Sequence, residues 1–117
     1  IRLDAGAVFY YEWRDSKTPY LVGPSLWFNK GQLTVGGNVL ATLPESQWIL
    51  VDITCKLGRA ADGTFDLGLA VPGAPPQSFT RLPFASPEFR RLDWLGFVSP
   101  ATEATNVYVD DVKVAVE

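Results

Sequence analysis

The sequence predicts an all-β fold, an antiparallel β-sandwich built from short strands. No stretch of the 117 residues shows a convincing helical periodicity, whereas β-branched and aromatic residues are abundant. The 10 glycines and 9 prolines recur at short intervals and mark frequent turns, which is typical of sandwiches and barrels. With 47% apolar residues, residues 1–117 can bury a real core, and we expect them to form one domain.

The closing stretch Val107–Val116 carries the clearest strand pattern. It alternates apolar and polar residues over its whole length, so we expect a long strand with one buried face. That face is expected to hold Tyr108, Asp110, Val112, Val114 and Val116. A carboxylate on such a face needs hydrogen-bond donors or a cation, because burying it alone is costly.

The rest of the chain is expected to supply further short strands, about nine in hairpin-like succession. Strand patterns occur at Ala7–Asp15, Tyr20–Val22, Ser25–Asn29, Gln32–Val35, Val39–Leu43, Gln47–Leu57, Thr64–Val71, Gln77–Leu82 and Arg91–Ser99. We expect Gly23-Pro24 to end a strand, because proline cannot donate a hydrogen bond to a β-ladder. Within Ala7–Asp15, successive residues fall on opposite faces of the strand, so that alternate residues share a face.

Composition excludes several classes of protein. A net charge of −3 without a basic face argues against nucleic acid as a partner, and no apolar run approaches the roughly 18 residues of a membrane span. The single cysteine, Cys55, cannot form an internal disulfide and is expected to be a small core hydrophobe rather than a reactive thiol. One cysteine leaves the cellular compartment open.

Seven motifs occur in a familiar order along the chain. They are Tyr11-Glu12-Trp13-Arg14, Gly23-Pro24, Leu40–Pro44 with Trp48, Val51-Asp52-Ile53, Asp62-Gly63-Thr64-Phe65, Leu95–Ser99 and Val109-Asp110-Asp111-Val112. This order resembles the C-terminal half of the concanavalin A-like (laminin G-like) jelly-roll domains of bacterial extracellular proteins. The ending is also similar to that of jelly-roll carbohydrate-binding modules.

The resemblance implies a jelly-roll sandwich that lacks N-terminal strands, since such domains usually begin earlier. Its edges would then be covered by a second polypeptide, a neighbouring copy or a proteolytic partner; the other possibility is a reduced, self-sufficient sandwich. Exposed edges at Ala7–Asp15 would favour the first. The chain begins at Ile1 without a signal-like segment, so we expect a processed chain or a piece of a longer one. The implied location is extracellular or in the cell envelope.

Catalysis is not expected. The chain contains no histidine, which excludes Ser-His-Asp triads and histidine metal ligands. Glycoside hydrolysis needs two opposed carboxyl groups, but the spacing of Glu12 and Asp15 places them on opposite faces of a strand. The Glu-x-Asp-x-x-Glu motif of laminarinase-type relatives is absent. A glycoside hydrolase or lyase is therefore the least favoured function.

A binding site is the favoured hypothesis. Tyr10, Glu12 and Arg14 share one strand face, where a ring could stack on a sugar and charged groups could bind its hydroxyls. The other interpretation is a solvated outer face with a cross-strand ion pair. Trp27 is the best candidate for an exposed ring, because it shares a face with Ser25 and Asn29. The other three tryptophans, Trp13, Trp48 and Trp94, are expected in the core.

We therefore expect a non-catalytic binding module, for carbohydrate, with Tyr10, Glu12, Arg14 and Trp27 as ligand-binding residues. The alternative is a structural half-domain completed by another chain. The resemblance also implies a structural calcium held by Asp110, and no other cofactor. The competing interpretation is that Asp110 accepts hydrogen bonds from backbone amides near a sheet edge.

Overall fold

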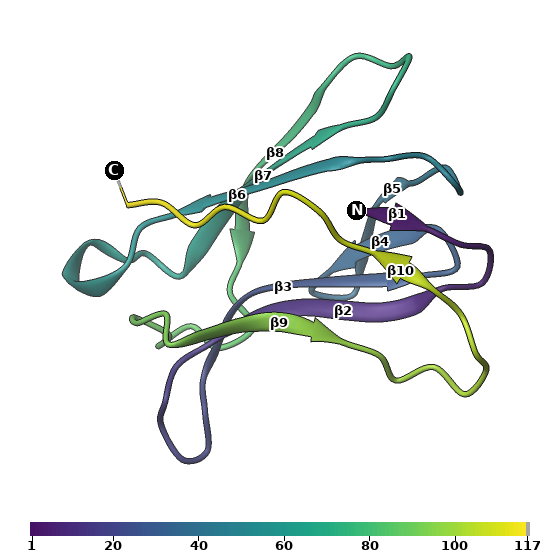
Figure 1. Ribbon diagram of the computed structural model, residues 1–117. Helices are drawn as coiled ribbons and strands as arrows, with labels where there is room; N and C mark the ends of the chain where they lie inside the picture. The colour runs from purple at the N-terminus through teal and green to yellow at the C-terminus, as the bar shows by residue number, and fades with distance from the viewer. Residues whose placement is uncertain (117) are drawn as a thin grey trace.

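Two antiparallel sheets face each other across a shared core in the computed structural model, which describes residues 1–116 (Figure 1). The five-stranded sheet has the order β5-β4-β3-β2-β9, the three-stranded sheet is β6-β7-β8, and β1 pairs with β10. The strands are β1 (Arg2–Leu3), β2 (Val8–Arg14), β3 (Val22–Asn29), β4 (Gln32–Val35), β5 (Asn38–Thr42), β6 (Leu50–Cys55), β7 (Thr64–Ala70), β8 (Gln77–Pro83), β9 (Trp94–Val98) and β10 (Val107–Tyr108). The antiparallel β-sandwich is thus confirmed, while its jelly-roll character stays a prediction.

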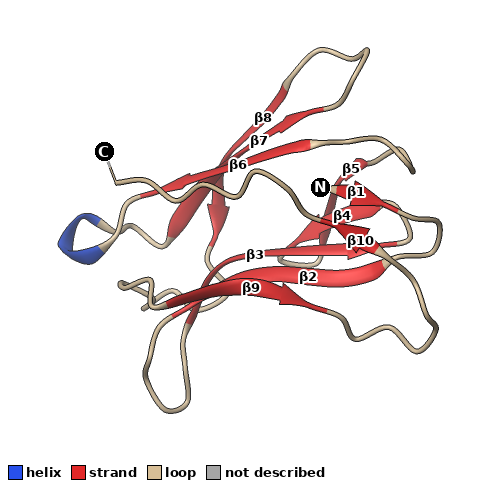
Figure 2. Cartoon of the chain, viewed as in Figure 1, coloured by secondary structure: helices blue, strands red, loops and turns tan. Residues whose placement is uncertain are grey.

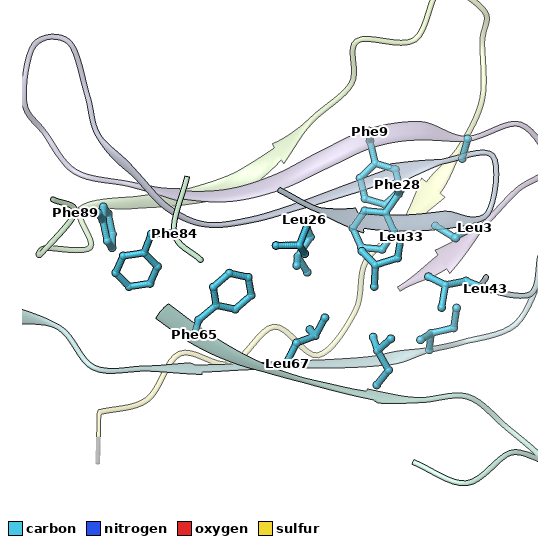
Figure 3. Packing of buried hydrophobic residues seen from close by; sticks show 14 residues of the cluster. Leu3, Phe9, Leu26, Phe28, Leu33, Leu43, Phe65, Leu67, Phe84 and Phe89 are labelled. Carbon is cyan, nitrogen blue, oxygen red and sulfur yellow. The ribbon is translucent and has the colours of Figure 1, made fainter. Parts of the chain in front are cut away.

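The core lies between the sheets and is dominated by aromatic and leucine side chains (Figure 3). Phe9 of β2 stacks on Phe28 of β3 with ring centroids 4.5 Å apart. Phe65 and Leu67 of β7 face them from the opposite sheet. Each fully buried side chain of this kind contributes roughly 1.5–3 kcal/mol relative to exposure, so the cluster is the main force that holds the two sheets together.

Strand β2 lies in the interior of its sheet, with β3 on one side and β9 on the other. Its side chains alternate between the two faces of the sheet as the sequence predicts, since Phe9 is buried in the core and its neighbour Tyr10 stacks on Trp27 on the outer face. The expected strand Ala7–Asp15 is therefore confirmed. Exposed edges here would have favoured a half-domain completed by another chain, but both edges of β2 are paired.

Strand β3 continues through Gly23-Pro24, where the sequence predicted a stop. The pairing register with β2 shifts between Glu12 and Arg14, so the Gly-Pro pair lies at an irregularity of the ladder. Proline is tolerated at such a position because no regular ladder hydrogen bond is required of it. Gly23 is needed there as well, because the ring of Phe89 occupies the space that a Cβ atom would fill.

The prediction of a long buried strand at Val107–Val116 is wrong beyond Tyr108. Only Val107 and Tyr108 pair, with Leu3 and Arg2 of β1. Val112, Val114 and Val116 are 60%, 63% and 99% exposed, because no strand lies beside this segment within the described residues. Alternation in a sequence signals a face that could be buried, but burial also requires a paired neighbour.

Smaller differences concern strand ends. Strand β6 is shorter than the expected Gln47–Leu57, and β1 was missed because two residues carry no periodicity. The single helical element in the described chain is a 3₁₀ turn at Gly58–Ala60 (Figure 2). No helix within residues 1–116 has the length and apolar character needed to cross a membrane.

Candidate functional site

The outer face of the five-stranded sheet brings the four predicted ligand-binding residues together. Tyr10, Glu12 and Arg14 project from alternate positions of β2, and Trp27 lies opposite Tyr10 on β3. The rings of Tyr10 and Trp27 stack with centroids 4.4 Å apart and planes inclined by 21°. Trp27 is 42% exposed, so the prediction that its ring is exposed is confirmed. We call this surface the aromatic face.

Glu12 and Arg14 form the expected ion pair, but within one strand rather than across strands. Arg14 Nε donates to Glu12 Oε1 at 2.6 Å. Glu12 is only 7% exposed, although a solvated position was the competing interpretation for this face. The charge of a buried carboxylate must be compensated, and the arginine beside it does so.

Arg14 also lies against two aromatic rings. Its guanidinium carbon lies 4.4 Å from the ring centroid of Tyr20 and 4.2 Å from that of Trp94. The pKa of Arg14 is raised, because the hydrogen bond and charge of Glu12 outweigh the effect of desolvation, which alone would lower it. The guanidinium thus stays a cation in contact with two aromatic rings, to which it is attracted by cation–π interactions.

The prediction that Trp94 belongs to the core is wrong. It pairs with Arg14 and faces outward from β9, with more than a third of its surface exposed. Its indole lies over Gly96, where a Cβ atom would be 2.5 Å from the ring. A glycine two positions from a tryptophan, on the same face of a strand, is the signal that could have revealed this ring.

A hollow of about 380 Å³ adjoins Trp27 on the same sheet, with a mainly apolar wall that carries a few polar groups. Its polar lining comes from Ser25, Asn29, Gln32 and Thr34, on strands β3 and β4. These hydroxyl and amide groups can both donate and accept hydrogen bonds. Sequence reasoning missed the hollow, because Gln32 and Thr34 become neighbours of Trp27 only through the pairing of β3 with β4.

The remaining tryptophans lie away from this face. Trp48 is 46% exposed, so its predicted core position is wrong. It precedes β6, and its ring centroid lies 5.8 Å from the guanidinium carbon of Arg2. Trp13 is partly buried against the core, as expected, and its Nε1 donates to Tyr11 Oη at 2.9 Å. Trp48 therefore provides an exposed tryptophan outside the candidate site.

The carboxylates singled out in the sequence have local roles. Asp110 is exposed rather than buried, and its Oδ1 accepts the backbone amide of Asp111 at 2.8 Å. No group of three or more His, Cys, Asp or Glu side chains that could hold a metal occurs in the described part of the chain, so the calcium at Asp110 stays a prediction. Asp15 Oδ1 accepts the amides of Lys17 and Leu21, which fixes the turn after β2.

Comparisons with known proteins add no relative. No family model matches the chain, and no match was found among curated proteins or solved structures. The aromatic face and its hollow are therefore the basis for a proposal of function.

Proposed function

We propose that this protein is a non-catalytic module that binds carbohydrate on the aromatic face. The observation that carries the proposal is the exposed ring of Trp27, backed by Tyr10 and bordered by the hollow with its hydroxyl and amide groups. Sugars present apolar ring faces that stack on aromatic planes, and hydroxyls that exchange hydrogen bonds with amides and side-chain hydroxyls. An extracellular or envelope location, implied by the resemblance, belongs to the same proposal.

The arrangement suits an extended ligand. Trp27 and its hollow would hold one sugar, with Asn29 and Gln32 as hydrogen-bonding partners. Arg14, which lies four residues after Tyr10 on β2 and contacts the rings of Tyr20 and Trp94, would hold another sugar. Tyr10 and Arg14 are separated by about 13 Å along the strand, at about 3.3 Å per residue, so a short oligosaccharide could span both positions.

Calorimetric titration against a broad panel of polysaccharides tests this function. We expect binding by the wild-type protein and at least an about tenfold loss in the Trp27→Ala variant, which removes the stacking plane. Trp48→Ala is the matched control, since this tryptophan is similarly exposed but lies elsewhere. Failure of the wild type to bind any glycan, or an equal loss in both variants, would contradict the proposal.

A further inference from the structure

Strand β6 is an edge strand of the three-stranded sheet, and the C-terminal segment runs past it (Figure 2). Strand β7 covers one edge of β6, and no strand within residues 1–116 covers the other. A cavity of about 710 Å³ lies along this free edge. Its walls include Val51 and Ile53 of β6, Phe28 of the opposite sheet, and residues 109–113 of the closing segment. We call this cavity the strand groove.

At one end of the strand groove, the first residues of the chain already pair with the backbone just before β6 as a strand would. Ile1 exchanges two hydrogen bonds with Ile49, its nitrogen donating at 2.8 Å and its carbonyl accepting at 2.7 Å. On its other side β1 pairs with β10, since Arg2 lies opposite Tyr108. Residues 1–3 therefore lie as a strand between two neighbours, the residues just before β6 on one side and β10 on the other. The strand groove continues along the same line.

The free edge of β6 has the hydrogen-bonding pattern of an unfinished ladder. Because Ile49 exchanges both bonds with Ile1, every second residue after it points its amide and carbonyl toward the same edge. These residues are Val51, Ile53 and Cys55. Their side chains are partly buried against the core, so their face of β6 is the inner one.

The closing segment, Val107–Val116, forms the opposite wall of the strand groove, and its valines fall on the face that matches the inner residues of β6. Asp111 has a φ of 54°, the left-handed conformation found in the bulges that insert one extra residue into a strand. One inserted residue shifts the alternation of the side chains by one position. Val112, Val114 and Val116 then fall on the same face as Val107, which packs against the core. Three exposed valines would then line up with the three inner residues of β6.

We propose that the strand groove binds an extended segment of a separate polypeptide, other than a second copy of this chain, as a strand between β6 and the closing segment. The guest would run antiparallel to both, as β1 does, over the six residues of Leu50–Cys55. Its side chains at alternate positions would be small and apolar, between the inner residues of β6 and the three valines. The guest would complete a five-stranded sheet opposite the existing one. This site is separate from the aromatic face.

A designed peptide tests the proposal on the intact chain. The probe is a blocked peptide Lys-Val-Thr-Val-Thr-Val-Lys, titrated by calorimetry and followed by amide hydrogen exchange. We expect binding together with slowed exchange at Val51 and Ile53. The matched control is the same peptide with its three valines N-methylated, because these valines would donate to β6. We expect it to bind at least about tenfold more weakly.

Variants of the closing segment test the other wall. Val112→Asp and Val114→Asp should each weaken binding of the peptide at least about tenfold, because they place a charge on the face that the guest would cover. Val39→Asp is the matched control, since Val39 of β5 is 56% exposed and lies outside the strand groove; it should leave binding unchanged.

Three results would overturn the proposal. They are absence of binding at millimolar peptide, equal binding of the N-methylated peptide, and a dimer by sedimentation that already protects the β6 amides. The last would identify a second copy as the occupant. Glycan titrations are unaffected by any of these outcomes, so the two proposals can fail separately.

Discussion

Single residues decide where aromatic rings can lie in this sandwich. Gly23 and Gly96 each leave space that a ring occupies, Phe89 over the first and Trp94 over the second. One ring closes the core at the start of β3, whereas the other extends the aromatic face. Both glycines lie in β-strands, where glycine is otherwise unfavourable, so close packing of a ring explains their presence.

Gly23→Ala should destabilise the protein. The added methyl group would overlap the buried ring of Phe89, and overpacking of this kind costs about 1–3 kcal/mol. Urea unfolding followed by tryptophan fluorescence measures the change. Gly68→Ala is the control, because a Cβ atom there would meet its nearest neighbour, Asp52, at an ordinary 3.6 Å. Equal stability of the two variants would contradict the close contact.

Cys55 should make the protein less stable at high pH. Desolvation by burial, followed by the charge of Asp62, raises the pKa of Cys55 from 9.0 to about 11. The unfolded chain therefore loses its thiol proton first, so stability should fall as the pH rises from about 9 to 11. Urea unfolding at pH 8, 9 and 10 checks this, with Cys55→Ala expected to show a smaller decline. An identical decline in both proteins would exclude the thiol as its source.

At the scale of elements, alternation predicted strands well where both neighbours of the strand exist. Strand β2 is the clear example, since its inner residues pack against the core and its outer residues belong to the aromatic face. Val107–Val116 has an equally regular pattern, but only its first two residues pair. Trp94 was misplaced for a related reason, because pattern alone does not say which side of a strand has the opposite sheet. The hollow beside Trp27 exists only because β3 pairs with β4, so the sequence around Trp27 alone could not predict it.

The closing segment should contribute little to stability in the free chain. Val112→Ser and Val114→Ser should each change the free energy of unfolding by at most about 0.5 kcal/mol, because both side chains are already largely exposed. The matched control Val35→Ser removes a buried valine from β4 and should cost about 2 kcal/mol or more. Chemical denaturation measures all three. A large effect at Val112 would show that the segment is packed in solution.

At the scale of the whole molecule, the sandwich is fastened at its ends and open along one side. Near one end, the segment after β8 is hydrogen-bonded to β3. The backbone amide of Ala85 donates to the carbonyl of Gly23, and that of Ser86 donates to the carbonyl of Val22. At the other end, the ribbon of β1 and β10 joins the start of β6. Between these ends the sheets are held by side-chain packing, in which β7 supplies the centre of its sheet (Figure 3).

Phe65→Ala should therefore weaken both sheets together. The ring of Phe65 is 1% exposed, and truncating a buried phenylalanine costs about 3–5 kcal/mol. Because one core supports both sheets, amide exchange should accelerate equally in β3 and β7, and unfolding by circular dichroism should remain a single transition. Leu50→Ala, at the exposed start of β6, should change little and is the control. Faster exchange confined to β7 would instead mean that the five-stranded sheet is stable without its partner, since a shared core transmits the loss of one side chain to both layers.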